Sequence, residues 1–540
     1  MTKTGKKNGC DKNGEEEWTG EGIRQRTSGI LMPVSCLPGR YGIGDFGREA
    51  RMFVDWMETA GFHWWSILPL NPTSFGNSPY QSPSALAGSM NYISPDILER
   101  DGLLSREESE QAAMPEAGSQ VDYGRLFTEK PKLLRRAYRR FLDQEENGKE
   151  AYRTFCHENR EWLEDYASFM TVKEKTEYQP WHRWPQFLAQ RREPQFSEYM
   201  NRQKEEMDFW RFVQFVFFRQ WKELREYANG HGIRIMGDMP FYVAHDSVDV
   251  WRYRELFAVD AQSGDVTVWA GVPADSPEKE YRNWGNPVYR WENQRADEYA
   301  WFRRRVRMAG RMYDGLRVDH AIALSHFYAI EKDKETGKEK GKWCDGPDKK
   351  DGTLLDAICE EAKQMELSVI AEDLGMVPEG FRERLQKAGW PGMRLLQIAF
   401  TDKYGVDSNH LPFYHEKNMV VYTGTHDQPP LKQFLEELPE EKLAYMQWWT
   451  GRKTKEELLW ALIETAYQSV AGLVLLPLQD LLELGSEGRL VFQDDYENSW
   501  KWRLSDMALL DSRLAERMKK LAVLTGRRME EKQKLREYLQ

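Results

Sequence analysis

The 540-residue sequence lacks several features that would assign it to other classes of protein. It has only five cysteines and no Cys-x-x-Cys pair, which favours reduced thiols over a disulfide scaffold or a cysteine metal site. Its best apolar run, 470–478, has the length of a strand and is too short to span a membrane. Basic residues are not in excess, because the formal net charge is −11. The acidic balance disfavours nucleic acid or an anionic membrane as the main partner.

The beginning of the chain also lacks the apolar stretch of a secretory signal, so we expect a cytoplasmic protein. Residues 1–27 are rich in Lys, Gly and Glu, and we expect a flexible N-terminal tail there. Residues 28–540 contain no internal repeat. They are long enough for one large barrel with sizeable insertions, and we expect a single catalytic unit.

Eight short apolar runs are the most regular feature that is present. Each is followed by Gly, Pro or polar residues, which is typical of strands buried in a parallel sheet. Helical patterns lie between several of them, for example at 47–60 and 354–365. This alternation predicts an α/β protein built on a (β/α)8 TIM barrel. The expected strands are 30–34, 64–70, 233–238, 315–319, 368–373, 393–400, 419–423 and 471–478.

Two intervals between the expected strands are too long for simple loops. Residues 71–232 are rich in Trp, Tyr, Arg and Glu with helical spacing, which predicts a large, mostly helical insertion. Residues 241–300 contain much Trp, Gly and Pro, which predicts a second insertion made mainly of loops. A third stretch, 331–351, is rich in Lys, Asp and Gly, and we expect an exposed loop there.

Acidic residues directly follow several of the expected strands. Because the active sites of barrels lie at the carboxyl ends of the strands, we expect these acids to share one mouth. Arg317 and Asp319 are two residues apart on one strand, so their side chains face the same way. A guanidinium there would keep the acid ionised, and an ionised acid can attack an anomeric carbon. The alternative for an isolated Arg-x-Asp sequence is a structural ion pair.

Two further pairs leave the assignment open. Glu372 and Asp373 would point to opposite sides of a regular strand, and their spacing does not say which of them faces the mouth. The one that does could be a general acid if its surroundings raise its pKa. His426 and Asp427 end the seventh expected strand, but a His-Asp sequence is also a common structural pair. The histidines have no His-x-x-x-His or comparable spacing, so no metal site is predicted.

Several longer motifs stand in order along the chain. They are Leu-Pro-Gly-Arg-Tyr-Gly-Ile-Gly-Asp at 37–45, Ser-Pro-Tyr-Gln-Ser at 78–82, Trp-Gly-Asn-Pro at 284–287, Pro-Gly-Met-Arg at 391–394 and Pro-Leu-Gln-Asp-Leu-Leu at 477–482. With the strand-end acids, these motifs closely resemble those of the 4-α-glucanotransferases, also called amylomaltases or disproportionating enzymes, of glycoside hydrolase family 77 in the α-amylase clan. The resemblance extends from about residue 28 to residue 504.

The resemblance implies a retaining mechanism on α-1,4-glucans. Asp319 would be the nucleophile, and Glu372 would protonate the leaving oxygen and later activate the acceptor hydroxyl. Asp427, with His426 beside it, would hold the ring hydroxyls of the donor sugar and stabilise the transition state. Arg317 would keep Asp319 charged and oriented. Double displacement predicts that the nucleophile and the acid lie about 5–5.5 Å apart.

Other matching positions extend the predicted site. Asp238, Tyr80 and Asp402 match positions that line the donor site, and Trp284 matches one near the acceptor. The implied donors are maltooligosaccharides and α-1,4-glucans, and the implied acceptor is glucose or a maltooligosaccharide. No metal and no organic cofactor are implied, because the carboxylates suffice. Insertions that cover the mouth would exclude water and so favour transfer.

The sequence departs from the pattern of this family in four stretches around the expected pocket, at 274–283, 321–323, 428–430 and 490–494. The first of these lacks the aromatic residue that would guide the acceptor. Drift within the family would leave the usual activity unchanged, whereas altered loops could change acceptor choice, chain-length preference or water exclusion. Two alternatives are therefore an α-glucan hydrolase on the same scaffold and a weakly active glucan-binding protein. Intact Asp319, Glu372 and Asp427 argue against the second.

Overall fold

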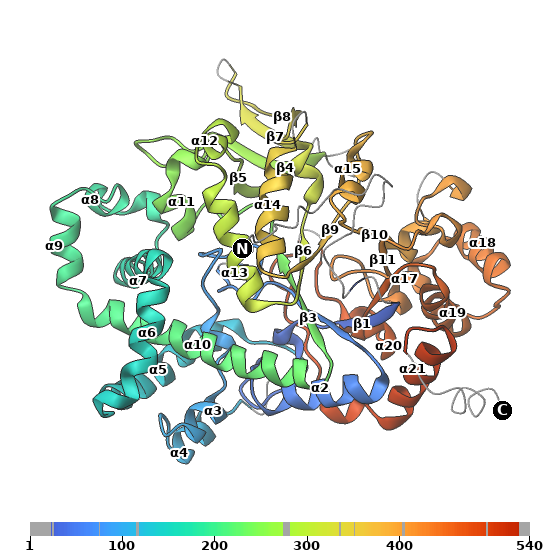
Figure 1. The fold of residues 1–540 in the computed structure, drawn as a ribbon, viewed down its shortest axis with the longest axis horizontal. Helices are drawn as coiled ribbons and strands as arrows, with labels where there is room; N and C mark the ends of the chain where they lie inside the picture. The colour runs from blue at the N-terminus through green and yellow to red at the C-terminus, as the bar shows by residue number, and fades with distance from the viewer. Residues whose placement is uncertain are drawn as a thin grey trace, which may run out of the picture.

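Eight parallel strands form the centre of the computed structural model (Figure 1). Their order is β10-β11-β12-β1-β2-β3-β6-β9, so neighbouring strands follow one another along the chain. A hydrogen bond from the Ala371 N–H to the Pro391 carbonyl (2.9 Å) joins the two ends of this order and nearly closes the sheet. The predicted (β/α)8 barrel is confirmed. The strands are β1 (Thr27–Leu31), β2 (Trp64–Ser66), β3 (Arg234–Met239), β6 (Gly315–Val318), β9 (Ser368–Ala371), β10 (Gly392–Leu395), β11 (Met419–Tyr422) and β12 (Leu473–Pro477).

The structure describes residues 23, 26–74, 76–114, 118–273, 281–333, 336–349, 352–401, 405–492 and 495–528. Most of the expected tail, residues 1–22, lies outside the described residues, and so does Asp402. Among the described helices, none is both long and apolar enough to cross a membrane.

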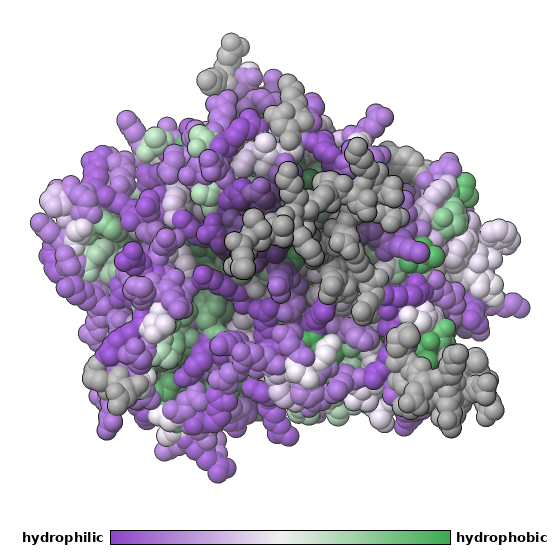
Figure 2. Space-filling view, viewed as in Figure 1, coloured by the Kyte–Doolittle hydropathy of each residue, from purple (hydrophilic) through white to green (hydrophobic). Residues whose placement is uncertain are grey.

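Helices surround the barrel and also form a large group between β2 and β3 (Figure 1). That group lies on one side of the molecule and consists of α3 (Pro95–Arg100), α4 (Arg106–Gln111), α5 (Tyr123–Leu142), α6 (Glu150–Glu158), α7 (Arg160–Lys175), α8 (Gln186–Ala189), α9 (Gln195–Asn201) and α10 (Lys204–Gly230). The other helices are α2 (Arg48–Ala60), α11 (Val248–Arg252), α12 (Trp291–Ala296), α13 (Ala300–Met312), α14 (Thr353–Gln364), α15 (Phe381–Lys387), α16 (Leu396–Ala399), α17 (Leu431–Glu437), α18 (Glu440–Thr450), α19 (Lys455–Gln468), α20 (Leu478–Leu481) and α21 (Ser512–Leu524). In the space-filling view of the same face, hydrophilic side chains predominate and apolar ones occur in small groups (Figure 2).

Strand side chains alternate between two apolar clusters. The smaller cluster contains alternate residues of several strands, among them Trp64, Met236, Ile370, Tyr422 and Leu475, and we assign it to the barrel interior. The larger cluster contains the residues between these positions and packs against the helices. This alternation decides which polar side chains at the strand ends point into the barrel.

The predicted strand 393–400 is wrong in its second half. Strand β10 ends at Leu395, and the one-turn helix α16 begins at the next residue. Most of this run is buried, and periodicity cannot separate a short buried strand from a short buried helix. The change of direction brings the Gln397 N–H to the Thr423 carbonyl (3.1 Å), next to the end of β11.

Part of the predicted loop 331–351 is also wrong. Strand β8 (Glu339–Asp345) pairs antiparallel with β7 (His326–Lys332), and both belong to a second sheet in the order β5-β4-β7-β8. Strands β4 (Val268–Pro273) and β5 (Tyr281–Pro287) lie within the interval 241–300, where loops were expected. The Lys-rich composition of β8 reflects an edge strand, where charged side chains face solvent, rather than a loop.

Candidate active site

The alternation along the strands brings three polar side chains to one end of the barrel interior. Leu316 and Val318 pack in the outer cluster, so Arg317 between them points inward. Asp238 lies two residues after Met236, and Glu372 lies two residues after Ile370. Met236 and Ile370 are interior residues, so Asp238 and Glu372 also point inward. All three lie at the carboxyl ends of their strands, which is the mouth of the barrel.

Arg317 is the centre of this group. One guanidinium nitrogen, Nη1, lies 2.6 Å from Asp238 Oδ2 and 2.8 Å from Asp319 Oδ1. The other, Nη2, lies 2.7 Å from Glu372 Oε2. Glu372 Oε2 also accepts a hydrogen bond from the His320 N–H (2.8 Å). Both donors therefore contact Oε2 and leave Oε1 of Glu372 for another partner.

Asp373, the neighbour of Glu372, lies on the other face of the strand. Its side chain is 1% exposed and contacts Arg382 Nε (2.7 Å) and Arg394 Nη1 (3.0 Å). It also accepts a hydrogen bond from the Met393 N–H (2.7 Å), which ties β9 to β10. Of the two acids, Glu372 is thus the one beside Asp319, and the contacts of Asp373 are those of a structural residue.

His426 and Asp427 lie on the opposite side of the mouth. The His426 ring stacks on Tyr80 with ring centres 5.3 Å apart and an angle of 10° between the planes. The Tyr80 hydroxyl donates a hydrogen bond to Asp238 Oδ2 (2.9 Å), which connects this stack to Arg317. Asp427 Oδ1 lies 3.5 Å from His426 Nε2, and the Asp427 side chain is 53% exposed. Asp427 is therefore the acid of this group most open to a ligand.

Trp500 belongs to the same stack, and the sequence pattern did not indicate it. Its ring centre lies 5.9 Å from that of Tyr80 and 5.8 Å from that of His426. Trp500 has a backbone φ of 68°, a left-handed conformation that few non-glycine residues adopt. It lies outside every expected strand end, so only the fold brings it to the mouth.

Trp284 lies on the Glu372 side of the site. Its ring meets the ring of His320 edge to face, with centres 4.7 Å apart and an angle of 88°. His320 directly follows Asp319 and has a φ of 47°. The Trp284 carbonyl accepts a hydrogen bond from Gln81 Nε2 (2.9 Å), so the segment after β2 helps to hold β5 in place. Of the predicted residues that the structure describes, Tyr80 and Trp284 thus lie on two sides of one mouth.

The carboxyl groups influence one another because they are buried and close together. Burial and the negative charges of Glu372 and Asp238 raise the pKa of Asp319 well above its usual range, although Arg317 opposes this. Burial also acts to raise the pKa of Glu372, but Arg317, a hydrogen bond with Asp319 and the His320 N–H outweigh it and lower that pKa to about 2. Asp319 and Glu372 therefore behave as a pair that keeps one proton. The two shifts have opposite directions, upward for the pKa of Asp319 and downward for that of Glu372.

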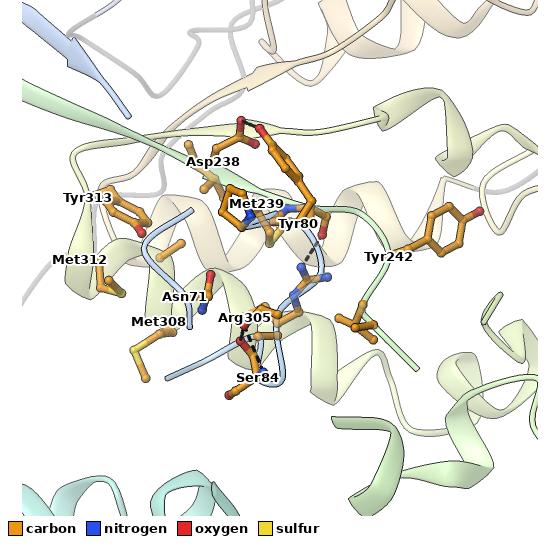
Figure 3. Close-up of a pocket in the computed structure, with 18 residues that line it drawn as sticks. Asn71, Tyr80, Ser84, Asp238, Met239, Tyr242, Arg305, Met308, Met312 and Tyr313 are labelled. Atoms are coloured by element: carbon orange, nitrogen blue, oxygen red, sulfur yellow. Dashed lines mark hydrogen bonds between the residues drawn. The ribbon is translucent and has the colours of Figure 1, made fainter. Parts of the chain in front are cut away.

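A small cavity lies behind the mouth and is bordered by Asp238 and Tyr80 (Figure 3). In Figure 3, the hydrogen bond between these two residues lies on one side of the cavity and Arg305 lies on the other. The volume is about 40 Å³, which can hold water but not a sugar ring.

The stretches that depart from the family pattern differ in their placement. Residues 274–280 lie outside the described residues, and so do 493 and 494. Ala321, Ile322 and Ala323 are buried in the apolar core. The Leu490 carbonyl accepts a hydrogen bond from the Trp500 N–H (2.7 Å), so this stretch supports the aromatic stack.

The arrangement suits the cleavage of an acetal. Two adjacent carboxyl groups that share one proton can supply both an acid for a leaving oxygen and a nucleophile for an anomeric carbon. A third carboxylate, on Asp427, is exposed and could contact a bound molecule.

Comparison with known proteins adds independent observations. A family model described as 4-alpha-glucanotransferase matches residues 32–509. A 4-alpha-glucanotransferase from Clostridium butyricum is 36% identical over 501 residues, which cover 92% of this chain and 100% of that protein. One from Thermus thermophilus is 38% identical over 488 residues, which cover 89% of this chain and 95% of that protein. Among solved structures, an amylomaltase from Streptococcus agalactiae in complex with acarbose has a TM-score of 0.87 and 34% identity, covering 94% of this chain and 100% of that one.

Proposed function

This chain belongs to the 4-alpha-glucanotransferase family, and from that premise we propose that it moves segments of α-1,4-glucans from a donor maltooligosaccharide to an acceptor sugar by retaining double displacement. It is an enzyme of the transferase class. One observation carries the proposed mechanism: Arg317 contacts both Asp319, at 2.8 Å, and Glu372, at 2.7 Å. Residues 28–540 would act as one catalytic unit, with insertions at about 71–232 and 241–300.

In the first step, a carboxylate oxygen of Asp319 attacks the anomeric carbon of the donor. The bond from that carbon to the glycosidic oxygen breaks, and the leaving sugar takes a proton from Glu372. The product of this step is a glucosyl ester on Asp319. We assign this proton to Oε1 of Glu372, because the two groups that donate hydrogen bonds to Glu372, Arg317 Nη2 and the His320 N–H, both contact Oε2.

The shared proton must then lie on Glu372 rather than on Asp319. A donor sugar between the two side chains would separate them and present the glycosidic oxygen as a hydrogen-bond acceptor to Glu372. Arg317 would remain in contact with Asp319 and stabilise its ionised form. Substrate binding would thus move the proton to the side where it is needed.

In the second step, the carboxylate of Glu372 removes the proton from an acceptor hydroxyl. The acceptor oxygen attacks the anomeric carbon, the ester bond breaks, and Asp319 is released. Asp427 would bind ring hydroxyls of the donor sugar, since it is the most exposed acid of the group. Trp284 would contact the acceptor, because it lies beside His320 on the Glu372 side.

The proposed setting is the cytoplasm, with a role in starch or glycogen metabolism and with glucose or maltooligosaccharides as acceptors. The free thiols of Cys36, Cys156, Cys344 and Cys359 suit a reducing compartment.

Incubation with maltotriose tests the proposed function. Chromatography should show glucose together with a ladder of longer maltooligosaccharides, and a separate assay should show constant total reducing ends. Rising reducing ends with only shorter products would instead identify an α-glucan hydrolase. The Asp319→Asn variant serves as the control for activity that does not come from this site.

A further inference from the structure

The loop that carries His426 and Asp427 departs from the family pattern at residues 428–430, and the proposed chemistry does not explain why. The loop connects the end of β11 to the beginning of α17. Asp427 itself has few contacts that could fix it, because its N–H lies 3.4 Å from Thr425 Oγ1 and its side chain is 53% exposed. The position of this acid therefore depends on how the rest of the loop is held, including its two ends.

One buried side chain reaches both ends. Asp480, in the short helix α20 after β12, accepts a hydrogen bond on Oδ2 from Thr423 Oγ1 (2.6 Å). On Oδ1 it accepts a hydrogen bond from the Leu431 N–H (2.7 Å). Thr423 directly precedes the loop, and Leu431 is the first residue after it. Both hydrogen bonds are short, so this one side chain joins the two ends of the loop.

The middle of the loop has a second set of contacts. Gln397 Nε2 donates to the Pro429 carbonyl (2.9 Å). Gln428 Oε1 accepts hydrogen bonds from the N–H (2.9 Å) and the Oγ1 (2.7 Å) of Thr425. The side chain of Gln428 therefore points back into its own loop. Since Pro429 and Pro430 have no N–H, the Leu431 N–H is the first backbone donor after Gln428, and Asp480 holds it.

Asp480 is an unusual residue to find at this place. It is 0% exposed, and it makes no ion pair with a basic side chain in the described part of the chain. A buried carboxyl group without a cationic partner costs stability. His426 is the other titratable side chain that lines the same small cavity. A residue that costs stability and contacts the loop of an active-site acid points to a role in the reaction.

We propose that Asp480 is a positioning residue, whose carboxyl group joins the two ends of the loop 424–430 and so holds Asp427 in place for the donor sugar. This inference rests on the proposed function of Asp427. Burial raises the pKa of Asp480 to about 7, but its two hydrogen bonds to the loop do not require a negative charge. A neutral carboxyl group can still accept from the Leu431 N–H and can donate to Thr423 Oγ1.

The experiment compares Asp480→Ala with Asp480→Asn. The asparagine variant keeps both contacts, because its oxygen can accept from the Leu431 N–H and its amide can donate to Thr423 Oγ1. We expect Asp480→Ala to lower kcat for transfer from maltotriose by roughly 10- to 100-fold, as a misplaced active-site group does, and Asp480→Asn to stay within about 3-fold. The expected rescue by asparagine is a result that simple loss of volume would not explain.

Asp348 offers a matched control. It is also buried, and its two carboxylate oxygens accept hydrogen bonds from the N–H groups of Leu354 and Leu355 (both 2.8 Å) at the start of α14. It makes no described contact with the loop 424–430. Asp348→Ala should therefore lower the unfolding temperature to a similar extent and leave kcat unchanged at temperatures where both variants are folded.

A double variant separates this inference from the proposed function. Asp427→Asn should reduce kcat strongly, and adding Asp480→Ala to it should reduce kcat further by less than about 3-fold, since both act through one group. If Asp427→Asn is inactive but Asp480→Ala is fully active, the positioning role is wrong. If Asp427→Asn keeps its activity, the proposed function of Asp427 is wrong instead. Should Asp480→Ala not fold, Thr423→Val removes one of the two contacts and must lower kcat for the inference to stand.

Discussion

Two buried guanidinium groups at opposite ends of the barrel have opposite surroundings. Arg317, at the carboxyl ends of the strands, contacts three carboxylates. Arg527, which follows α21, contacts no carboxylate of the residues that the structure describes. Its nitrogens donate to the backbone carbonyls of Thr27, Tyr467, Ser469, Ala471 and Gly472 at distances of 2.9–3.4 Å. Thr27 begins β1, Tyr467 lies in the last turn of α19, and the other three residues lie between α19 and β12, so this is the other end of the barrel.

The difference also appears in the pKa values. Although burial acts against it, the negative charges of Asp238, Glu372 and Asp319 raise the pKa of Arg317 well above its usual range. Burial and the nearby Arg26 lower the pKa of Arg527 to about 9. Carboxylates can gain a proton or form an ester, so a guanidinium among them can take part in a reaction. Carbonyl groups cannot, so we assign Arg527 to stabilising the fold, by tying the segment after α21 to the residues around the starts of β1 and β12.

The largest expected effect is at the mouth, in Glu372→Gln. This change removes the proposed proton donor and little volume, so kcat should fall by roughly 1,000-fold or more while glucan binding remains. Turnover of maltotriose and calorimetric titration with acarbose measure the two quantities. Asp373→Asn is the control, because Asp373 contacts Arg382 and Arg394 and should affect stability more than kcat. If Glu372→Gln keeps most of its activity, Glu372 is not the proton donor.

The next effect compares the two guanidinium groups directly, beginning with Arg317→Lys. A lysine has one point charge and cannot contact Asp238, Asp319 and Glu372 together, so kcat should fall by roughly 100-fold. The pH dependence of kcat should also shift, because a single ammonium group cannot make the separate contacts that Arg317 makes with Asp319 and Glu372. An unchanged pH profile would mean that Arg317 is structural and that the contrast with Arg527 is not functional.

Arg527→Lys should have the opposite outcome. Lysine has fewer donors than the carbonyl groups around Arg527 require, and unsatisfied buried groups should lower the free energy of unfolding by about 2–4 kcal/mol. At temperatures where the variant is folded, kcat should be unchanged. Denaturant unfolding measures the first quantity, with Arg106→Lys at an exposed ion pair as the control that should change neither. A loss of kcat in folded Arg527→Lys would contradict the assignment of a purely structural role to Arg527.

A pH-dependent effect on stability is expected at Asp480, a buried acid at the mouth. Its pKa is raised from 3.8 to about 7 in the folded protein, so folding favours its protonated form. The stability that this group contributes is fully present below pH 4 and is lost as the pH rises through about 7. Between those values, the free energy of unfolding should fall relative to Asp480→Asn by at most about 1.4 kcal/mol per pH unit. Unfolding curves of both proteins at pH 5 and pH 8 measure the difference, and parallel pH profiles would contradict a raised pKa.

Much of the barrel could be predicted from the sequence, since a buried strand leaves a local apolar run and a strand end leaves a polar residue. The eight expected strands correspond to the eight of the barrel, and the two-residue spacing of Arg317 and Asp319 predicted that both face the mouth. The end of β10 and the existence of β8 were not predictable, because a buried run fits strand or helix and an edge strand has the composition of a loop. The spacing of Asp319 and Glu372 expected for double displacement stays a prediction.

The sequence by itself thus determined the strands, the identity of the acids at their ends and the family pattern, because these depend on residues within a few positions of one another. Only the tertiary structure decided that Glu372 rather than Asp373 lies beside Asp319. It also decided that Tyr80, His426 and Trp500 form one stack. In the described part of the chain, Asp480 is buried without a cationic partner and Arg527 without a carboxylate partner. These contacts join residues far apart in the chain. They exist because the closing of the barrel, and not the local pattern, brings one strand end next to another.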